Sequence, residues 1–367
     1  MLDSLMVPFA YKSLKLANRF VMAPMSRYFA PGGTPGREIA DYYRRRIDGG
    51  VAGVITEGVA VDVPGAVAAD AVPHFHGERP LQGWQHVVDG VHASGGAFIP
   101  QLWHVGGCTD FNFPDSPHDQ LVSPSGLVGL DMPGGRPMTE EDIADVIASF
   151  ARAARDAVRM GCDAIELHGA HGYLFDQFFW DVTNKRTDGY GGSDIGARAS
   201  FAAETVAAIR EAVGPDLAII FRVSQWKVYD YDARLARDTA EMEQWLTPLV
   251  DAGVDIFHAS ERRFWEPTFE GSDLNLAGWV KAVTGCPTIT VGSIGLSRDL
   301  MADFVEGTSQ PEVEKLDDLR RRFERGDFDL VAVGRALLSD PEWLRKVLAH
   351  DLTDLKPYAL ETKDILY

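Results

Sequence analysis

The stretch GCDAIELHGAHGYLFDQFFW, from Gly161 to Trp180, decides the fold. It opens with a glycine of the kind that ends helices, and a short apolar run follows from Ala164 to Leu167. The run then breaks into a polar cluster that contains His168, His171 and Tyr173. An apolar strand that delivers ionisable side chains at its carboxyl end is how a (β/α)8 barrel builds an active site.

The same pattern recurs along the chain. A glycine or a helix end is followed by a short apolar run, and the run ends in polar residues or glycine. Continuous apolar runs of this length are typical of parallel strands buried on both faces. Eight candidate strands lie within 20–23, 49–58, 97–102, 160–169, 217–223, 252–260, 288–291 and 326–335. No G-x-G-x-x-G turn follows the first of them, as a Rossmann sheet would require. The pattern therefore predicts an α/β fold, a single (β/α)8 TIM barrel spanning residues 1–367 as one domain.

Segments with helical periodicity separate most of these runs. Residues 139–160 have Thr139 as N-cap, acids in the first turn and Gly161 just past the end. Residues 195–213 and 239–252 are also predicted helices, and Pro248 should kink or shorten the second. Two connections are long. We expect 106–138 to form a lid or wall, and 296–325 to form a solvated helical excursion.

Composition excludes several classes of function. The 367 residues include 35 basic and 54 acidic side chains, a net charge of −19 that opposes general binding to nucleic acid or anionic membrane. The three cysteines lie far apart and form no C-x-x-C pair, so we expect no iron–sulfur cluster, zinc site or disulfide framework, and a reduced cytoplasmic location. No signal peptide or membrane-spanning run is evident.

The residues at several strand ends each allow two interpretations, one structural and one functional. Pro24, Met25 and Ser26 end the first strand, either as a simple proline stop, which these residues alone favour, or as a wall beneath a planar cofactor. Gly58 permits a turn or the close approach of a ligand. Gln101 suits a core hydrogen bond as well as the edge of a heterocycle.

The cluster HGAHGY is more specific. Two histidines three residues apart could share a metal ion, but no helix carries them and no third ligand is evident, so we expect no metal. The pair His168 and His171 instead suits hydrogen-bond donation to a substrate oxygen, and Tyr173 could supply a proton.

Three further places in the sequence, on the fifth, seventh and eighth strands, carry groups that bind anions. Arg222 follows four apolar residues, and burying it is costly unless it faces an anion or an electron-rich ring. Gly292-Ser293 and Gly334-Arg335 end the seventh and eighth strands, where this fold usually binds phosphate. The glycines would expose backbone N–H groups and the arginine would bind the phosphate in a bidentate way.

Together these residues resemble the Old Yellow Enzyme family of FMN-dependent ene-reductases, from about Pro8 to Leu348. The densest resemblance is HGAHGYLFDQFFWDVTNKRTDGYGGS, followed by Arg198. It implies non-covalent FMN at the carboxyl-terminal mouth of the barrel. Its implied cofactor-binding residues are Pro24, Met25, Ser26, Gly58, Gln101, Arg222, Gly292, Ser293, Gly334 and Arg335.

The resemblance also implies the chemistry. NAD(P)H would reduce the flavin, and an α,β-unsaturated carbonyl or nitro compound would then bind in its place. His168 and His171 would hold the substrate oxygen, hydride would pass from flavin N5 to the β-carbon, and Tyr173 would protonate the α-carbon.

This sequence departs from the family pattern in places. Ser26 stands where other members have threonine or cysteine, and FFWD at 178–181 replaces a commoner run ending in Ser-Pro. The segment 260–273 is unusually aromatic and charged. Either its side chains pack within the loop, or Tyr28, Trp103, Phe264 and Trp265 shape the substrate pocket.

Two other functions stay open at this point. One is a single-domain oxidative demethylase of a small cyclic amine, whose cation the aromatic residues at 264–265 would enclose. The other is an FMN carrier or sensor without turnover, against which the intact His168, His171 and Tyr173 argue. The predicted partner is in each case a small molecule, and both a monomer and a homo-oligomer are compatible with the sequence.

Overall fold

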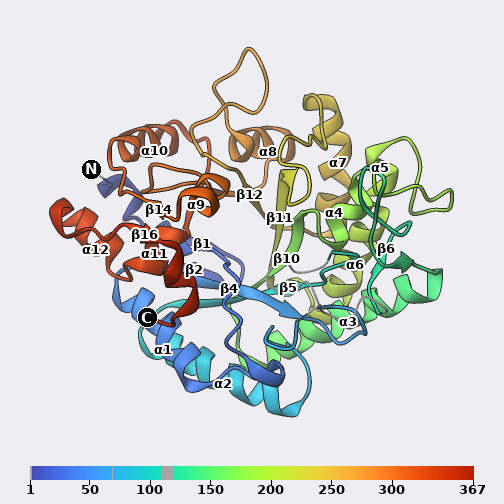
Figure 1. Ribbon diagram of the computed structural model, residues 1–367, viewed down its shortest axis with the longest axis horizontal. Coiled ribbons are helices and arrows are strands. Elements are labelled where there is room, and N and C mark those ends of the chain that lie inside the picture. The colour runs from blue at the N-terminus through green and yellow to red at the C-terminus, as the bar shows by residue number, and fades with distance from the viewer. Residues whose placement is uncertain (1, 68, 109–119) are drawn as a thin grey trace.

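A closed barrel of eight parallel strands forms the centre of the molecule, in a computed structural model that describes residues 2–67, 69–108 and 120–367 (Figure 1). Neighbouring strands follow chain order and the last pairs with the first, so the sheet has no free edge. The strands are β3 (Phe20–Met22), β4 (Gly53–Ala60), β5 (Ala97–Trp103), β10 (Ala164–His171), β11 (Ala218–Lys227), β12 (Ile256–Ser260), β13 (Thr288–Val291) and β15 (Leu330–Val333). Each coincides with a predicted run, and the (β/α)8 prediction is confirmed.

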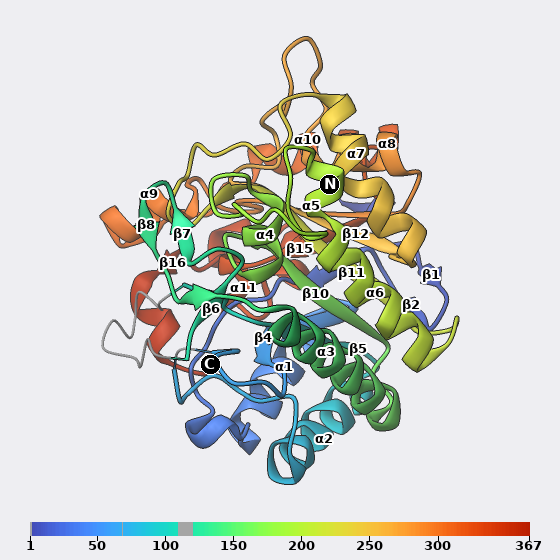
Figure 2. The ribbon, with the colours of Figure 1, turned by 90° about the vertical axis from the view of Figure 1, so that its right-hand side faces the viewer.

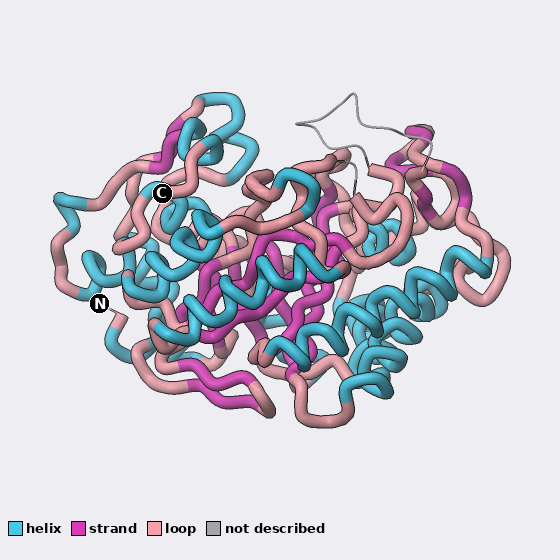
Figure 3. Tube along the Cα trace, turned by 90° about the horizontal axis from the view of Figure 1, so that it is seen from below, coloured by secondary structure: helices cyan, strands magenta, loops and turns pink. Residues whose placement is uncertain are grey.

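Helices surround this barrel, as Figure 3 shows for the cyan helices outside the magenta strands. They are α1 (Arg37–Asp48), α2 (Glu78–Ala93), α3 (Glu140–Met160), α6 (Ser200–Val213), α7 (Thr239–Ala252), α8 (Leu276–Thr284), α10 (Glu314–Arg325) and α12 (Trp343–Leu348). Figure 2 shows α3 and α6 side by side across β10 and β11.

Alternation along the strands produces two separate apolar cores. Side chains such as Ile55, Ile99 and Ile220 fill the barrel interior. Bulkier ones such as Phe98 and Trp245 pack between strands and helices. Because the lower interior is filled with side chains, a ligand can enter only at the carboxyl ends of the strands.

The helix termini follow their sequence signals with two exceptions. In α3, Thr139 and Asp142 form a reciprocal capping box, and Gly161 ends the helix in the left-handed conformation with φ of 77°. The predicted helix 195–213 is instead divided at Ala199 into α5 (Ile195–Arg198) and α6. The expected shortening of 239–252 is wrong, since α7 continues through Pro248 to Ala252.

The ends of the barrel are covered differently. A hairpin of β1 (Phe9–Tyr11) and β2 (Leu14–Leu16) was not predicted, and its Phe9, Leu14 and Leu16 extend the interior core at the amino end. The carboxyl end carries β6 (Val122–Ser123), β7 (Leu127–Gly129), β8 (Met132–Pro133), β9 (Arg136–Pro137), α4 (Leu174–Phe179), α9 (Leu300–Glu306), β14 (Thr308–Ser309), α11 (Arg335–Ser339) and β16 (Tyr358–Ala359).

The two predicted insertions differ in outcome. Connection 106–138 forms the small β6–β9 and β7–β8 pairs, and its residues 109–119 lie outside the described residues. Connection 296–325 is only partly an insertion, because α10 at its end is the barrel helix between β13 and β15. Within the described part of the chain, no helix has the length and apolarity needed to cross a membrane.

Candidate active site

A cavity of about 970 Å³ opens at the carboxyl end of the barrel. Residues near or just past the carboxyl ends of all eight strands line it, among them Pro24, Gly58, Trp103, His171, Trp226, Ser260, Val291 and Ala332. Every residue predicted to act in catalysis or to hold the cofactor also lines it: Pro24, Met25, Ser26, Gly58, Gln101, His168, His171, Tyr173, Arg222, Gly292, Ser293, Gly334 and Arg335. The barrel thus brings together positions separated by as many as 311 residues, from Pro24 to Arg335.

Two aromatic residues predicted for the substrate pocket also lie there, and two do not. Tyr28 and Trp103 line the cavity. Phe264 is fully buried, packs edge-on against Trp265 and lies outside the lining, as does Trp265. The prediction for Phe264 and Trp265 is therefore wrong. The loop turns back so that the Phe264 N–H donates to the Gly292 carbonyl, which directs these rings into the helix-side core.

The histidines and the tyrosine form one aromatic cluster on the cavity wall. The ring centres of His168 and His171 are 5.1 Å apart, and those of His168 and Tyr173 are 5.0 Å apart. Trp103 meets the Tyr173 ring edge-on at 5.0 Å. The His171 ring stacks on Trp226 at 4.2 Å, and its Nε2 lies 2.8 Å from the Ser260 hydroxyl.

Burial determines the charge state of these histidines. It lowers the pKa of both His168 and His171 well below the usual range, and the nearby Arg222 guanidinium lowers each further. Both imidazoles are therefore neutral at neutral pH and can donate one hydrogen bond each. His171 also holds a left-handed backbone with φ of 67°, a conformation that is uncommon for non-glycine residues.

A buried network beneath this cluster fixes the turn that carries it. The Asp176 carboxylate accepts the Gly172 N–H at 2.7 Å, and the Gln177 amide donates to the Gly172 carbonyl at 2.7 Å. Lys227 on β11 lies 2.9 Å from Asp176, and both side chains are fully buried. Both backbone polar groups of the residue preceding Tyr173 are thus held by side chains.

Beneath the floor of the cavity lie two titratable residues, Glu166 and His258, that the sequence did not predict. Gln101 donates to Glu166 at 2.7 Å, and Glu166 lies 2.7 Å from His258 Nδ1. Arg222 lies alongside, its Nε has no hydrogen-bond partner among the described residues, and burial lowers its pKa to about 10. Glu166 stands two residues before His168 in the same strand, and this period-2 spacing is the signal that could have found it.

The first strand end is held by another buried carboxylate. Glu57 accepts the backbone N–H groups of Arg27 and Tyr28 at 2.7 and 3.2 Å, directly after Ser26. Burial raises the pKa of Glu57 to about 7, and its Oε1 has no hydrogen-bond partner among the described residues. A Cβ at the adjacent Gly58 would lie 2.7 Å from the Trp103 ring, so glycine is required there.

The opposite end of the cavity is cationic. Arg335 donates to the Ser293 hydroxyl at 3.2 Å and to the Arg298 carbonyl at 3.0 Å, and it forms an ion pair with buried Asp303. A Cβ at Gly292 would lie 2.8 Å from the Glu261 carbonyl. Ser293 has a left-handed φ of 52°. The glycines, hydroxyl and guanidinium at the ends of strands β13 and β15 are groups of the kind that can bind a phosphate.

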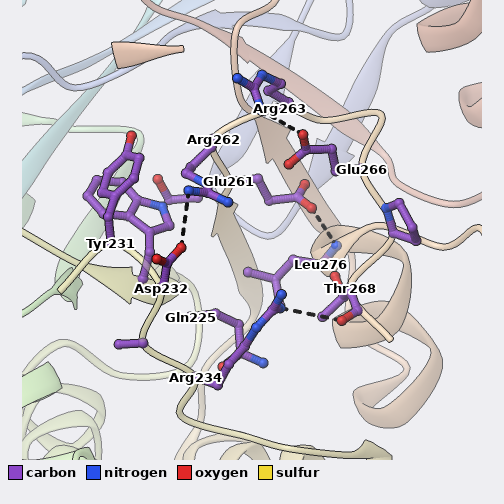
Figure 4. A pocket seen from close by; sticks show the side chains of 14 residues that line it. Gln225, Tyr231, Asp232, Arg234, Glu261, Arg262, Arg263, Glu266, Thr268 and Leu276 are labelled. Carbon is purple, nitrogen blue, oxygen red and sulfur yellow. Dashed lines mark hydrogen bonds and ion pairs between the residues drawn. The ribbon is translucent and has the colours of Figure 1, made fainter. Parts of the chain in front are cut away.

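A smaller side pocket of about 100 Å³ adjoins the cavity (Figure 4). The two spaces share Trp226, Tyr231, Ser260, Glu261 and Arg262 as lining residues. Figure 4 shows mixed charges here, with Arg262 facing Asp232 and Arg263 facing Glu266. The charged part of the segment 260–273 therefore forms a polar wall beside the site, while its aromatic part belongs to the core.

Comparison with known proteins identifies relatives over nearly the whole chain. Residues 4–310 match the model of the NADH:flavin oxidoreductase / NADH oxidase family. The chain is 31% identical to 12-oxophytodienoate reductase 7 of Oryza sativa subsp. japonica, over 92% of this chain and 86% of that protein. It is 34% identical to an NADH oxidase of Thermoanaerobacter brockii, over 91% of this chain but only 49% of that protein. A solved morphinone reductase in complex with tetrahydroNAD has a TM-score of 0.79 and 25% identity, covering 98% of this chain and 93% of that one.

Proposed function

Because the chain belongs to the NADH:flavin oxidoreductase / NADH oxidase family, that of Old Yellow Enzyme, we propose that specific residues of the cavity direct its chemistry. The protein is an FMN-dependent oxidoreductase that uses a nicotinamide hydride donor and reduces activated alkenes. Our proposal concerns which side chains hold FMN, which hold the substrate and which supplies the proton.

The residues present fit FMN. The cationic end formed by Gly292, Ser293, Gly334 and Arg335 suits the phosphate. Gln101 and the unpartnered Nε of Arg222 suit the polar edge of the isoalloxazine, and Pro24, Met25, Ser26 and Gly58 suit the ring's flank. The chemistry that bound FMN would supply is hydride transfer, from NAD(P)H to the β-carbon of the alkene.

The substrate would bind against the aromatic wall. Neutral His168 and His171 would donate hydrogen bonds to its carbonyl or nitro oxygen and draw charge away from the alkene. Because Nε2 of His171 is hydrogen-bonded to the Ser260 hydroxyl, Nδ1 is the ring nitrogen that would donate to the substrate oxygen. Tyr173, held by the Gly172 turn, would give its hydroxyl proton to the α-carbon.

One observation supports this assignment above the others. One cavity brings together the groups that we assign to the phosphate, to the ring edge and to the substrate oxygen, from strands far apart in the sequence. The amine-demethylase alternative loses the aromatic enclosure on which it depended, because Phe264 and Trp265 lie outside the lining. A cytoplasmic location and a homo-oligomeric assembly stay predictions.

Visible absorption spectra of the purified protein test the proposal. We expect a flavin spectrum that bleaches with anaerobic NADPH and recovers on addition of cyclohexenone. Bleaching without recovery would remove the enone assignment and favour amine substrates. Absence of flavin absorption even after addition of FMN would overturn the site itself.

A further inference from the structure

Three side chains form a hydrogen-bonded chain inside the barrel, one layer below the cavity. Gln101 on β5 bonds through its amide to Glu166 Oε1 on β10, at 2.7 Å. The other oxygen, Glu166 Oε2, lies 2.7 Å from Nδ1 of His258 on β12. Glu166 and His258 are fully buried, and Gln101 is 2% exposed. Of the three, only Gln101 borders the cavity.

The charge of Glu166 sets the direction of both bonds. Burial alone would raise the pKa of Glu166, but His258 and Arg222 outweigh it and hold the pKa below the usual range. Glu166 is therefore a carboxylate at neutral pH, and a carboxylate only accepts hydrogen bonds. Its two partners must donate, so His258 carries its proton on Nδ1 and Gln101 turns its amide NH₂ toward Glu166.

The orientation of the Gln101 amide determines which polar group the cavity floor offers to a ligand. An amide side chain can normally present either its oxygen or its nitrogen to a ligand. Here one N–H of the amide donates to Glu166 below, and this bond fixes which way the amide points. The carbonyl oxygen of Gln101 has no hydrogen-bond partner among the described residues and is therefore available to a ligand. The floor therefore presents a hydrogen-bond acceptor.

We propose that Glu166 and His258 are positioning residues that fix Gln101 as an acceptor, so that the floor selects a ring with an N–H group at that place. In FMN this group is N3–H of the pyrimidine ring. The inference rests on the proposed function, since it takes FMN as the bound ring. Neither Glu166 nor His258 touches the ligand, and both act through Gln101.

Nuclear magnetic resonance of bound FMN labelled with ¹⁵N at N3 tests the proposal. In the wild type we expect a downfield N3–H proton that exchanges slowly with water. Gln101→Met removes both the carbonyl and the NH₂ group of this side chain. It therefore gives the N3–H resonance that is expected when residue 101 makes no hydrogen bond to FMN. Glu166→Gln replaces a group that only accepts with one that can also donate, so the Gln101 amide is no longer fixed in one orientation. The proton resonance should move at least half-way to the Gln101→Met value, and FMN binding to the apoprotein should weaken by roughly five- to tenfold.

Asp255→Asn is the matched control. Asp255 is also a buried carboxylate, but it precedes β12 at the amino end of the barrel, where it pairs with Arg210 and Lys12. This variant should leave the N3–H signal unchanged even if it lowers stability. An unshifted signal in Glu166→Gln would overturn the positioning role, whereas absence of FMN binding in the wild type would overturn the proposed function instead.

A second variant covers the case in which Glu166→Gln does not fold. His258→Phe removes one donor to Glu166, leaving Arg222 on β11 as the charge that faces it and His168 on its own strand. Glu166 would then take up a proton more readily, so as pH falls the N3–H signal should begin to change at a higher pH than in the wild type. Identical pH dependences of the signal in His258→Phe and the wild type would also count against the proposal.

Discussion

At the scale of single residues, Tyr173 is the position whose proposed role is most sharply testable. Replacing it with phenylalanine removes the proton donor but keeps the ring that packs against Trp103 and His168. We expect re-oxidation of the reduced enzyme by cyclohexenone to slow by about 10²-fold or more. Reduction by NADPH should stay within about twofold of the wild type, as measured by stopped-flow absorbance. Equal slowing of the two half-reactions would remove Tyr173 from the proton transfer.

His168 should dominate the binding of phenols, whose oxygen imitates that of the substrate. His168→Ala removes one donor from a buried wall, so phenol affinity should fall by about tenfold. Because the pKa of the buried imidazole lies well below the usual range, wild-type affinity should not change from pH 6 to 8 through this group. Titration of the long-wavelength charge-transfer band measures both. A transition near pH 6.5 that disappears in His168→Ala would contradict the neutral state.

Because its pKa is raised, Glu57 should make the free energy of unfolding fall as the pH rises. Its folded-state pKa of about 7 lies above the unfolded value of about 4.5, so the folded state binds more protons between these values. The free energy of unfolding of the apoprotein should therefore fall as pH rises from 5 to 8, by up to about 3 kcal/mol through this group.

Glu57→Gln tests this assignment, since a glutamine oxygen can still accept the Arg27 and Tyr28 N–H groups. We expect the variant to lose this part of the pH dependence and to be the more stable protein at pH 8. Urea denaturation at pH 5 and 8 measures the difference. Parallel pH dependences in the two proteins would show that Glu57 titrates normally.

At the scale of elements, the Asp176–Lys227 ion pair joins α4 to β11 beneath the catalytic turn. Lys227→Met leaves a buried carboxylate without its charge partner, which typically costs about 3–5 kcal/mol. The double variant Asp176→Asn/Lys227→Met should recover most of this loss, because asparagine can still accept the Gly172 N–H. Urea denaturation of the four proteins forms the cycle.

An exposed ion pair provides the control for that cycle. Arg44 and Asp48 pair on the solvent side of α1 with side chains 42% and 48% exposed. Arg44→Met should change the free energy of unfolding by less than about 1 kcal/mol. If Lys227→Met lowered the free energy of unfolding no more than Arg44→Met does, the Asp176–Lys227 ion pair would contribute nothing to the stability of the turn.

The elements also show which features the sequence could predict. Long apolar runs ending in polar residues located all eight barrel strands, because parallel strands are buried on both faces. The β1–β2 hairpin escaped notice because three-residue strands are too short to show a period. The cavity-lining residues that the sequence did predict lie at or near strand ends, whereas Glu166 and His258 were missed because their partners lie on other strands. Phe264 and Trp265 were misplaced because loop direction depends on a backbone bond to Gly292.

At the scale of the whole molecule, the cavity touches the carboxyl ends of all eight strands. A ligand that contacts β15 on one side and β5 on the other therefore links strands on two sides of the barrel mouth. Anything that binds only the folded state stabilises it by mass action, by about 2.7 kcal/mol at a concentration 100 times the dissociation constant. FMN should consequently raise the unfolding midpoint of the apoprotein in a concentration-dependent way.

Riboflavin separates the contribution of the phosphate end from that of the ring. It retains the contacts proposed for Gln101 and Arg222 but lacks the group proposed to meet Arg335, so at equal concentration it should raise the midpoint less than FMN does. Arg335→Met alone would leave Asp303 buried without its partner, so the informative variant is Arg335→Met/Asp303→Asn. In that variant FMN and riboflavin should stabilise the barrel almost equally, since the cationic group is gone while the floor is intact. Thermal melts with both ligands measure this, and a full FMN advantage in the double variant would place the phosphate elsewhere.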